Sequence, residues 1–152
     1  MEKELKVSEL KDVKLLKFNV INLNKRFYQA DEFQKKKIIE DNECTLLEKL
    51  NSEDYPLFGE LGYPENFMTD MSRVSHQVSN IRIVDNCLIG DVKILNTTTG
   101  KSLADTLSVD KNSIVFRPRA SGSVREDGSV KVHDVYSFDA VLADNDAYKG
   151  LI

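Results

Sequence analysis

The spacing of hydrophobic residues changes several times along the chain, and each spacing predicts a different kind of element. Dense, β-prone apolar runs occupy residues 13–21 and 113–119, and apolar residues alternate with polar ones over residues 130–142. Runs of this kind are typical of strands. Two more strands are predicted within residues 74–96, joined by a turn at residues 84–86. The pattern therefore predicts at least five strands.

Helical spacing is confined to two segments. Over residues 30–50 the apolar positions follow a helical period that slips near Asp41, so one kinked helix and two short helices are both open. Residues 97–107 predict a short helix, because the oxygen of one of the threonines at residues 97–99 can accept a hydrogen bond from an early backbone N–H. Residues 51–73 contain prolines and glycines without a sustained period, which predicts a long loop.

The order of these elements favours one α+β domain that spans residues 1–152. Strands this close together, with an Asp-Gly turn at residues 127–128, favour an antiparallel β-sheet or β-barrel flanked by helices. A chain of 152 residues, 41% of them hydrophobic, is long enough to bury a core of its own.

Composition and charge narrow the classes of function. The formal net charge is −4 and no long block of like charges occurs, so nucleic-acid binding is not expected. The basic run Lys35-Lys36-Lys37 is flanked by acidic residues, which predicts a solvated helix face and leaves a basic docking patch as the alternative. No apolar stretch is long enough to span a membrane, and the first residues do not resemble a signal peptide, so we expect the protein in the cytoplasm where it is made.

No cofactor or metal site is predicted. Cys44 and Cys87 lie far apart, without a CxxC spacing or a nearby histidine. We expect two buried thiols in a reducing compartment rather than a metal site or a disulfide.

Two motifs resemble those of the prohead maturation proteases of T4-like phages. The segment LFGELGYP at residues 57–64 resembles the family's GELDHP turn, whose histidine is the general base, and Tyr63 stands in its place. The segment FRPRASGSV at residues 116–124 resembles the family's SSRGxGSV, in which the serine before the arginine is the nucleophile. Pro118 stands there. A phenol is a poor proton acceptor at neutral pH and proline has no nucleophilic side chain, so the family's catalytic pair is missing from these positions.

The resemblance extends over about residues 20–149 through weaker motifs in the same order. RVSHQV at residues 73–78 resembles the family's RVSHRV, and YSFDAVLAD at residues 136–144 resembles ITFDLVADP. The resemblance implies the fold of the herpesvirus assemblins, a β-barrel flanked by helices. It also implies a setting in the immature phage head, where the family cleaves scaffold and capsid proteins.

The resemblance and the missing pair together predict a non-enzymatic pseudo-protease of head morphogenesis. Such a protein would bind or inhibit the maturation protease, as the prohead-protease inhibitor of T4-like phages does, or bind its scaffold and capsid substrates. Its expected location is the host cytoplasm or the phage head, and self-association is open. Arg117 and Arg119 flank the nucleophile position and could grip a carboxylate of a bound chain. The alternative is two exposed strand arginines that keep a sheet edge soluble.

Two other classes of function remain open at this stage. An active serine endopeptidase could use Ser121 as nucleophile, His76 as base and Asp139 as orienting acid, with Ser123 and His133 as substitutes. Against it, His76 is in register with apolar strand positions and is predicted to be packed, His133 is predicted to face solvent, and the serines read as turn residues. Asp139 is equally well an outward-facing strand residue. The third class is a capsid decoration or host-defence-binding module that keeps only the fold.

Overall fold

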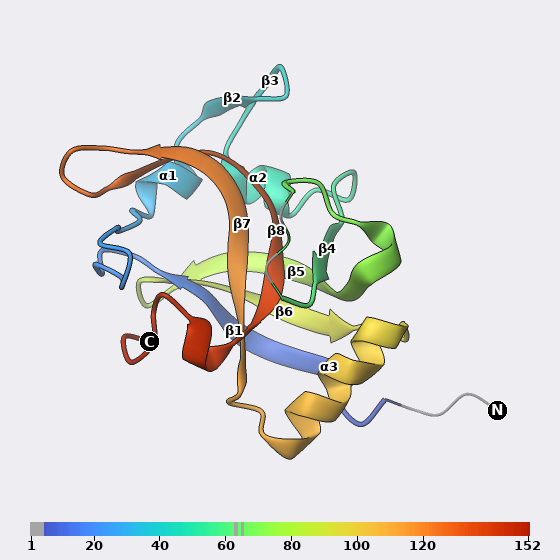
Figure 1. Ribbon diagram of the computed structural model, residues 1–152. Helices are drawn as coiled ribbons and strands as arrows, with labels where there is room; N and C mark the ends of the chain where they lie inside the picture. The colour runs from blue at the N-terminus through green and yellow to red at the C-terminus, as the bar shows by residue number, and fades with distance from the viewer. Residues whose placement is uncertain (1–4, 63, 65) are drawn as a thin grey trace.

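The computed structural model describes residues 5–62, 64 and 66–152. Its larger sheet is antiparallel and has four strands, which in spatial order are β1 (Glu9–Lys17), β6 (Cys87–Ile94), β5 (Val74–Val84) and β4 (Leu57–Glu60). A long antiparallel hairpin of β7 (Ile114–Val124) and β8 (Val130–Leu142) crosses this sheet (Figure 1). A small hairpin of β2 (Lys37–Ile39) and β3 (Asn42–Cys44) projects from one end.

The helices are short and lie outside the sheets. In Figure 1, α1 (Asp31–Gln34) and α2 (Leu46–Leu50) lie at the end of the molecule that carries the small hairpin, and α3 (Thr98–Val109) lies at the other end. Two single turns of 3-10 helix complete the elements, η1 (Met71–Arg73) and η2 (Ala143–Asn145). No helix among the described residues is long and apolar enough to cross a membrane.

The hairpin and helix predicted in the second half of the sequence are confirmed. The β5–β6 turn places Asp85 and Asn86 at φ of 49° and 65°, as a tight hairpin turn requires. Thr97 caps α3, since its side chain accepts a hydrogen bond from the backbone N–H of Gly100 at 3.0 Å. The predicted antiparallel arrangement is also confirmed.

Of the two alternatives for residues 30–50, the structure has two short helices, α1 and α2, but the β-hairpin that separates them was not predicted. The backbone turns at Glu40 and Asp41, which have φ of 50° and 66°, and the flanking residues pair as the β2–β3 hairpin. Helix α2 starts anew at Thr45, whose side chain and that of Glu48 form a capping box. The loop predicted over residues 51–73 also contains a strand, β4, which is too short to show a period.

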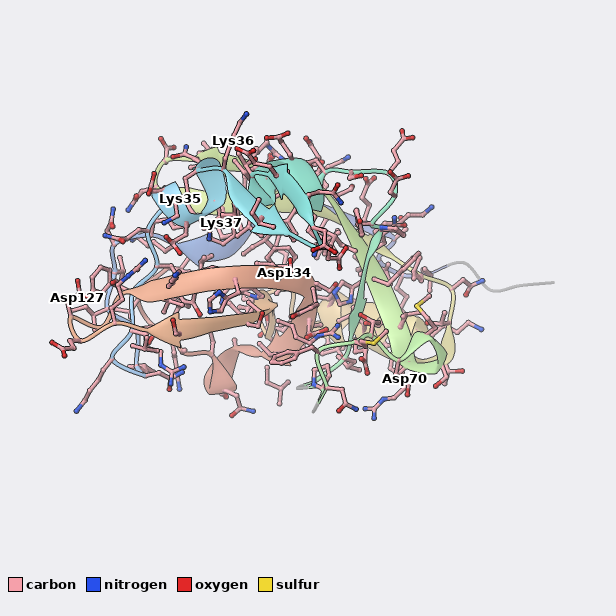
Figure 2. The ribbon with its side chains drawn as sticks, turned by 90° about the horizontal axis from the view of Figure 1, so that it is seen from above. Lys35, Lys36, Lys37, Asp70, Asp127 and Asp134 are labelled. Atoms are coloured by element: carbon pink, nitrogen blue, oxygen red, sulfur yellow. The ribbon has the colours of Figure 1, made fainter. Side chains whose placement is uncertain are left out.

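The lysine run is not a helix face. Lys35 Nζ lies 2.7 Å and Lys37 Nζ 3.3 Å from the carboxylate of Glu32, which is buried and also accepts the backbone N–H of Val132 at 2.7 Å. Burial raises the pKa of Glu32, but the hydrogen bonds from Lys35 and Val132 and the charge of Lys37 outweigh it and lower the pKa to about 2. Lys36 alone points outward in Figure 2.

No closed barrel is found in the part of the chain that the structure describes, so the β-barrel expectation becomes two sheets that meet along one side. The end of β4 reaches β8, where Gly62 N donates to Ala140 O at 2.7 Å. On the other side β7 approaches β1 through a side chain, since Arg117 Nη1 donates to Lys14 O at 2.8 Å. Pro118 has no N–H to donate to a neighbouring strand at this edge.

The core lies between the larger sheet and the β7–β8 hairpin. Its largest fully buried side chains are Phe18, Phe33, Phe116 and Phe138. Phe18 and Phe33 pack with their ring centroids 5.6 Å apart, which joins the end of β1 to α1. Cys87 is buried, whereas Cys44 is half-buried rather than buried, and both are free thiols.

The contact of β4 with the core makes a stability prediction. A Cβ added to Gly59 would lie 2.2 Å from both His76 Nε2 and Phe138 O. We expect Gly59→Ala to lower the free energy of unfolding by about 2 kcal/mol or more through overpacking, measured by urea denaturation. Lys101→Ala, at an exposed position of α3, should change it by less than about 0.5 kcal/mol. Equal stability of the two variants would contradict this account.

Candidate functional site

Residue 118 and the segment before residue 63 meet at one stretch of β8. Pro118 is paired with Phe138, and Gly62 is bonded to Ala140, two residues further along the same strand. Two residues of a strand span about 7 Å. Pro118 and Gly62 therefore lie beside neighbouring stretches of β8. Tyr63 itself lies outside the described residues.

His76 is a packed histidine, as predicted. Its ring is buried and stacks edge-on against Phe116 with centroids 4.9 Å apart. Nδ1 lies 2.7 Å from Ser75 Oγ and Nε2 lies 2.7 Å from Phe138 O. A carbonyl can only accept, so Nε2 donates to Phe138 O and Nδ1 accepts from Ser75. Burial lowers the pKa of His76 to about 4, so the ring is neutral at pH 7 with both nitrogens engaged.

The alternative catalytic group is not assembled. Ser121 is paired with Asp134 on β8, and its Oγ lies 3.1 Å from the hydroxyl of Tyr136. Phe138, which holds His76, is four residues further along β8, a distance of about 13 Å. Ser121 is thus a strand residue far from His76, and the turn predicted there is wrong.

The other residues considered for catalysis, Ser123, His133 and Asp139, do not form a catalytic group either. Ser123 is exposed and paired with Lys131, and it too is a strand residue rather than the predicted turn residue. His133 is exposed on β8, as predicted. Asp139 is buried rather than facing outward, and its carboxylate binds Arg119 and not a histidine.

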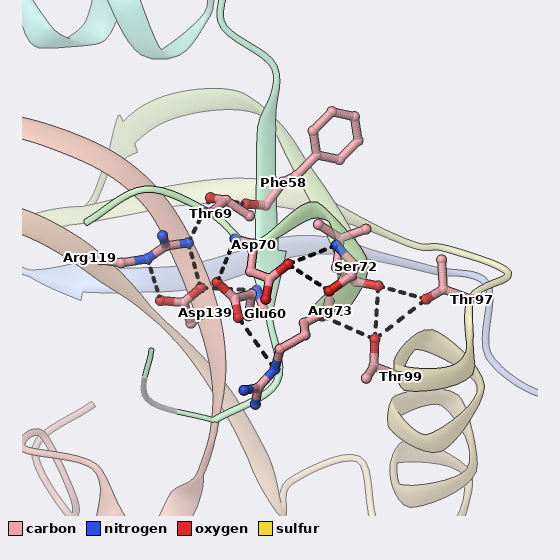
Figure 3. A network of polar contacts seen from close by, with 11 residues as sticks. Phe58, Glu60, Thr69, Asp70, Ser72, Arg73, Thr97, Thr99, Arg119 and Asp139 are labelled. Carbon is pink, nitrogen blue, oxygen red and sulfur yellow. Dashed lines mark hydrogen bonds and ion pairs between the residues drawn. The ribbon is translucent and has the colours of Figure 1, made fainter. Parts of the chain in front are cut away.

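Arg119 and Asp139 form the centre of a buried polar network (Figure 3). Arg119 Nε and Nη2 each donate to one oxygen of the Asp139 carboxylate at 3.0 Å, a two-bond fork. The backbone N–H of Glu60 donates to the same carboxylate at 3.0 Å. Burial raises the pKa of Asp139, and the hydrogen bonds from Arg119 and Glu60 offset that shift only in part.

The same network holds the segment that follows β4. Arg119 Nη1 donates to Phe67 O at 2.8 Å, and Nη2 lies 2.9 Å from Thr69 Oγ1. The N–H of Asp70 donates to Glu60 Oε2 at 3.1 Å. Polar contacts therefore fix residues 67–70 against β4, β7 and β8, and Figure 3 shows those of Thr69 and Asp70.

Arg117 is also satisfied within the chain. Its Nε and Nη2 donate to the carboxylate of Asp146 at 2.8 and 2.7 Å, and its guanidinium lies 5.6 Å from the ring centre of Tyr148. The side chains of Arg117 and Arg119 are only 12% and 7% exposed. The alternative of two exposed edge arginines is wrong, because each carries an internal carboxylate partner. A grip on a partner's carboxylate stays a prediction, and it would require these internal pairs to open.

The outer edge of β7 beyond Pro118 carries unused backbone groups. On β8, Val130 N donates to Phe27 O at 3.0 Å and Val132 N donates to Glu32, so both point away from β7. In an antiparallel pair the residue opposite such a position also points its backbone groups outward. Those residues are Val124 and Gly122.

Ala120 belongs to the same outward-facing set. It is paired with Val135, whose N–H donates to the side chain of Asp134 at 2.8 Å rather than to β7. Among the hydrogen bonds of the described chain, none engages the outward backbone groups of Ala120, Gly122 or Val124. A row of free donors and acceptors therefore starts beside Pro118 and runs to the end of β7.

A hollow of about 470 Å³ adjoins Pro118 on the side of β1 and η2. Its walls include Asn22, Tyr28, Arg117 and Tyr148. No group of three or more metal-ligating side chains occurs among the residues that the structure describes.

Comparisons with known proteins support a fold and no more. No protein-family model and no curated protein matches the chain. Among solved structures, the bacteriophage T4 capsid assembly protease, gp21, aligns with a TM-score of 0.55 and 17% sequence identity, over 89% of this chain and 91% of that chain. The chain has an α+β fold similar to that of the T4 protease, while the likeness to herpesvirus assemblins stays a prediction.

The Arg119–Asp139 pair makes a second stability prediction. Arg119→Met leaves a carboxylate buried without its cation, so we expect a loss of about 3–5 kcal/mol in unfolding free energy. Arg119→Met combined with Asp139→Leu should recover most of that loss, since neither charge is then stranded. The matched control is Arg73→Met, whose exposed guanidinium lies 3.7 Å from Glu60 and whose loss should cost under about 1 kcal/mol. A similar cost for both single variants would refute the role given to the pair.

The low pKa of His76 makes a pH prediction. The unfolded chain takes up this proton below about pH 6.5, whereas the folded chain does so only near pH 4. Stability from this group is therefore complete above pH 6.5 and is lost as the pH falls towards 4. Between pH 7 and 5 the unfolding free energy should drop by about 2 kcal/mol on this account.

Urea denaturation at several pH values measures how the unfolding free energy changes with pH. His76→Gln should flatten this dependence, and His133→Gln, at an exposed position, should leave it unchanged. If His76→Gln and the unaltered protein lose stability equally between pH 7 and 5, the buried neutral ring is not its source.

Proposed function

We propose that this protein is a non-enzymatic component of phage head assembly, a pseudo-protease that binds the maturation protease or its scaffold and capsid substrates. The observation that carries the proposal is the unpaired edge of β7, which starts at Pro118, where the resembling family has its nucleophile. The fold similarity to the T4 capsid assembly protease supports the setting. Its place would be the host cytoplasm or the phage head.

The side chains around Pro118 support the absence of catalysis. Residue 118 supplies no hydroxyl, and Ser121 is directed to Tyr136. A general base needs a free lone pair within hydrogen-bond reach of the nucleophile, and both nitrogens of His76 are engaged elsewhere. Nothing in this arrangement favours the endopeptidase alternative with Ser121 and His76.

The free edge of β7 supports binding of an extended chain. Outward N–H and C=O groups at Ala120, Gly122 and Val124 match the backbone of an added strand. The side chains over residues 120–123 are small, so a second backbone can approach closely. Edges are usually protected by charge or proline, and here only Pro118 interrupts the row. A chain held here would be bound without being cut, and it would be withheld from the active protease.

An inhibition assay tests the proposal. A purified prohead maturation protease digests its scaffold protein with and without this chain, and we expect digestion to slow as the chain is added. The variant Ala120→Pro/Val124→Pro removes two outward N–H donors and should weaken inhibition about tenfold or more. The matched control Ala120→Ser/Val124→Ala keeps both donors and should inhibit as the unaltered protein does.

A serine-reactive phosphonate probe tests the proposed absence of catalysis. We expect no labelling of the purified protein. Labelling of Ser121 that is abolished by Ser121→Ala would overturn the proposal of a non-enzymatic protein.

A pull-down from infected cells distinguishes the proposal from a capsid decoration module. Co-purification of protease or scaffold supports the proposal, whereas mature capsid alone supports a decoration module.

A further inference from the structure

A row of aromatic rings lies over β8 and the segment after β4, and it does not include the outward backbone groups of the β7 edge. The rings of Phe67 and Tyr136 are stacked, with centroids 5.1 Å apart and planes at 20°. Lys49 Nζ lies 5.7 Å from the centre of the Tyr136 ring and 5.5 Å from that of Tyr55, so it joins the two tyrosines. We call Tyr55, Tyr136, Phe67 and the adjoining Met68 the ring row.

The ring row is exposed to a degree that core packing does not explain. Phe67 is 55% exposed, Met68 82% and Tyr55 39%. Aromatic residues and methionine are enriched where proteins contact one another, and adjoining exposed apolar side chains mark such places. The row is therefore an exposed aromatic surface that the described chain does not cover.

Polar contacts hold the ring row in place before any partner arrives. The carbonyl of Phe67 accepts from Arg119, and the hydroxyl of Tyr136 bonds with Ser121 at 3.1 Å. Lys49 is fixed between the tyrosines by an ion pair with Asp134. A surface ordered in advance loses less conformational entropy when it binds.

The charge around the row is negative. The interaction with Glu40, followed by burial and the charge of Asp54, raises the pKa of the Tyr55 hydroxyl. Glu53, Asp54 and Glu40 are exposed. Asp134 forms an ion pair with Lys49 and neutralises the lysine within the row. Figure 2 shows where Asp134 lies.

We propose that the ring row docks a basic segment of a polypeptide partner. Lys49 lies over the rings of Tyr55 and Tyr136, so rings of this row bind a cation within the chain. Arginine or lysine of a partner would lie over the exposed ring of Phe67, which continues the row by stacking on Tyr136. Glu40, Glu53 and Asp54 would pair with further basic residues. A nucleic acid, with its own negative charge, does not fit this rim. This surface differs from the β7 edge, so either proposal can fail without the other.

A labelled peptide of alternating arginine and leucine with capped ends is the probe, read by fluorescence anisotropy on the whole chain. We expect saturable binding that weakens as salt is raised. Phe67→Ala keeps the backbone carbonyl that Arg119 holds and should weaken binding about tenfold. Glu53→Lys/Asp54→Lys should weaken it by a similar factor. The controls Leu23→Ala and Glu126→Lys change exposed residues elsewhere and should bind as the unaltered protein does.

Amide NMR spectra locate the probe independently of affinity. Added peptide should shift the signals of residues 55, 67, 68 and 136 and leave those of residues 122–124 in place. Three results would each overturn the proposal: no binding, equal binding of a matched peptide with glutamate in place of arginine, or equal affinity of Phe67→Ala and Leu23→Ala.

Discussion

The fork between Arg119 and Asp139 is the constraint on which the site depends. It joins β7 to β8 below the surface, and through Glu60 it joins β8 to β4, so one ion pair connects the two sheets. The same guanidinium holds residues 67–69 from the other side. A buried charge pair of this kind contributes little net stability, but losing one member is costly, which makes it a device for fixing one arrangement rather than for adding stability.

Fixing that arrangement has two consequences for binding. Because Arg119 is turned inward to Asp139, and Arg117 is taken by Asp146, the strand that carries Pro118 presents its backbone rather than its charges to the outside. Because the segment after β4 is tied down, Phe67 and Met68 stay exposed instead of collapsing onto the core. Both proposed surfaces thus follow from polar contacts that hold the backbone in place.

The sequence predicts the strands of the second half well, since the hairpin β5–β6, the helix α3 and strand β8 each have a clear period and clear turn residues. Over residues 30–50 it allows the two short helices but misses the hairpin of β2 and β3 between them. The slip of the helical period near Asp41 marks the place of the turn, but strands of three residues are too short to show a period of their own.

The site is harder to predict than the fold. The emptied positions Tyr63 and Pro118 are visible in the sequence through a resemblance, and the packed state of His76 through its register. The partners of Arg117 and Arg119 are not visible, because Asp146 and Asp139 lie 29 and 20 residues away in the chain. From sequence alone, an arginine beside a motif therefore looks free to bind a partner, even when it forms an ion pair within the folded chain.

The central claim is that this scaffold grips an extended chain and does not cut it. Hydrogen exchange of the backbone amides, with mass spectrometry of the added chain, measures both parts in one sample of purified protein and phage scaffold protein. The account predicts that the amides of Ala120, Gly122 and Val124 gain protection while the scaffold protein stays intact. Scaffold fragments formed without any other protease, or unchanged exchange at those three amides, would contradict it.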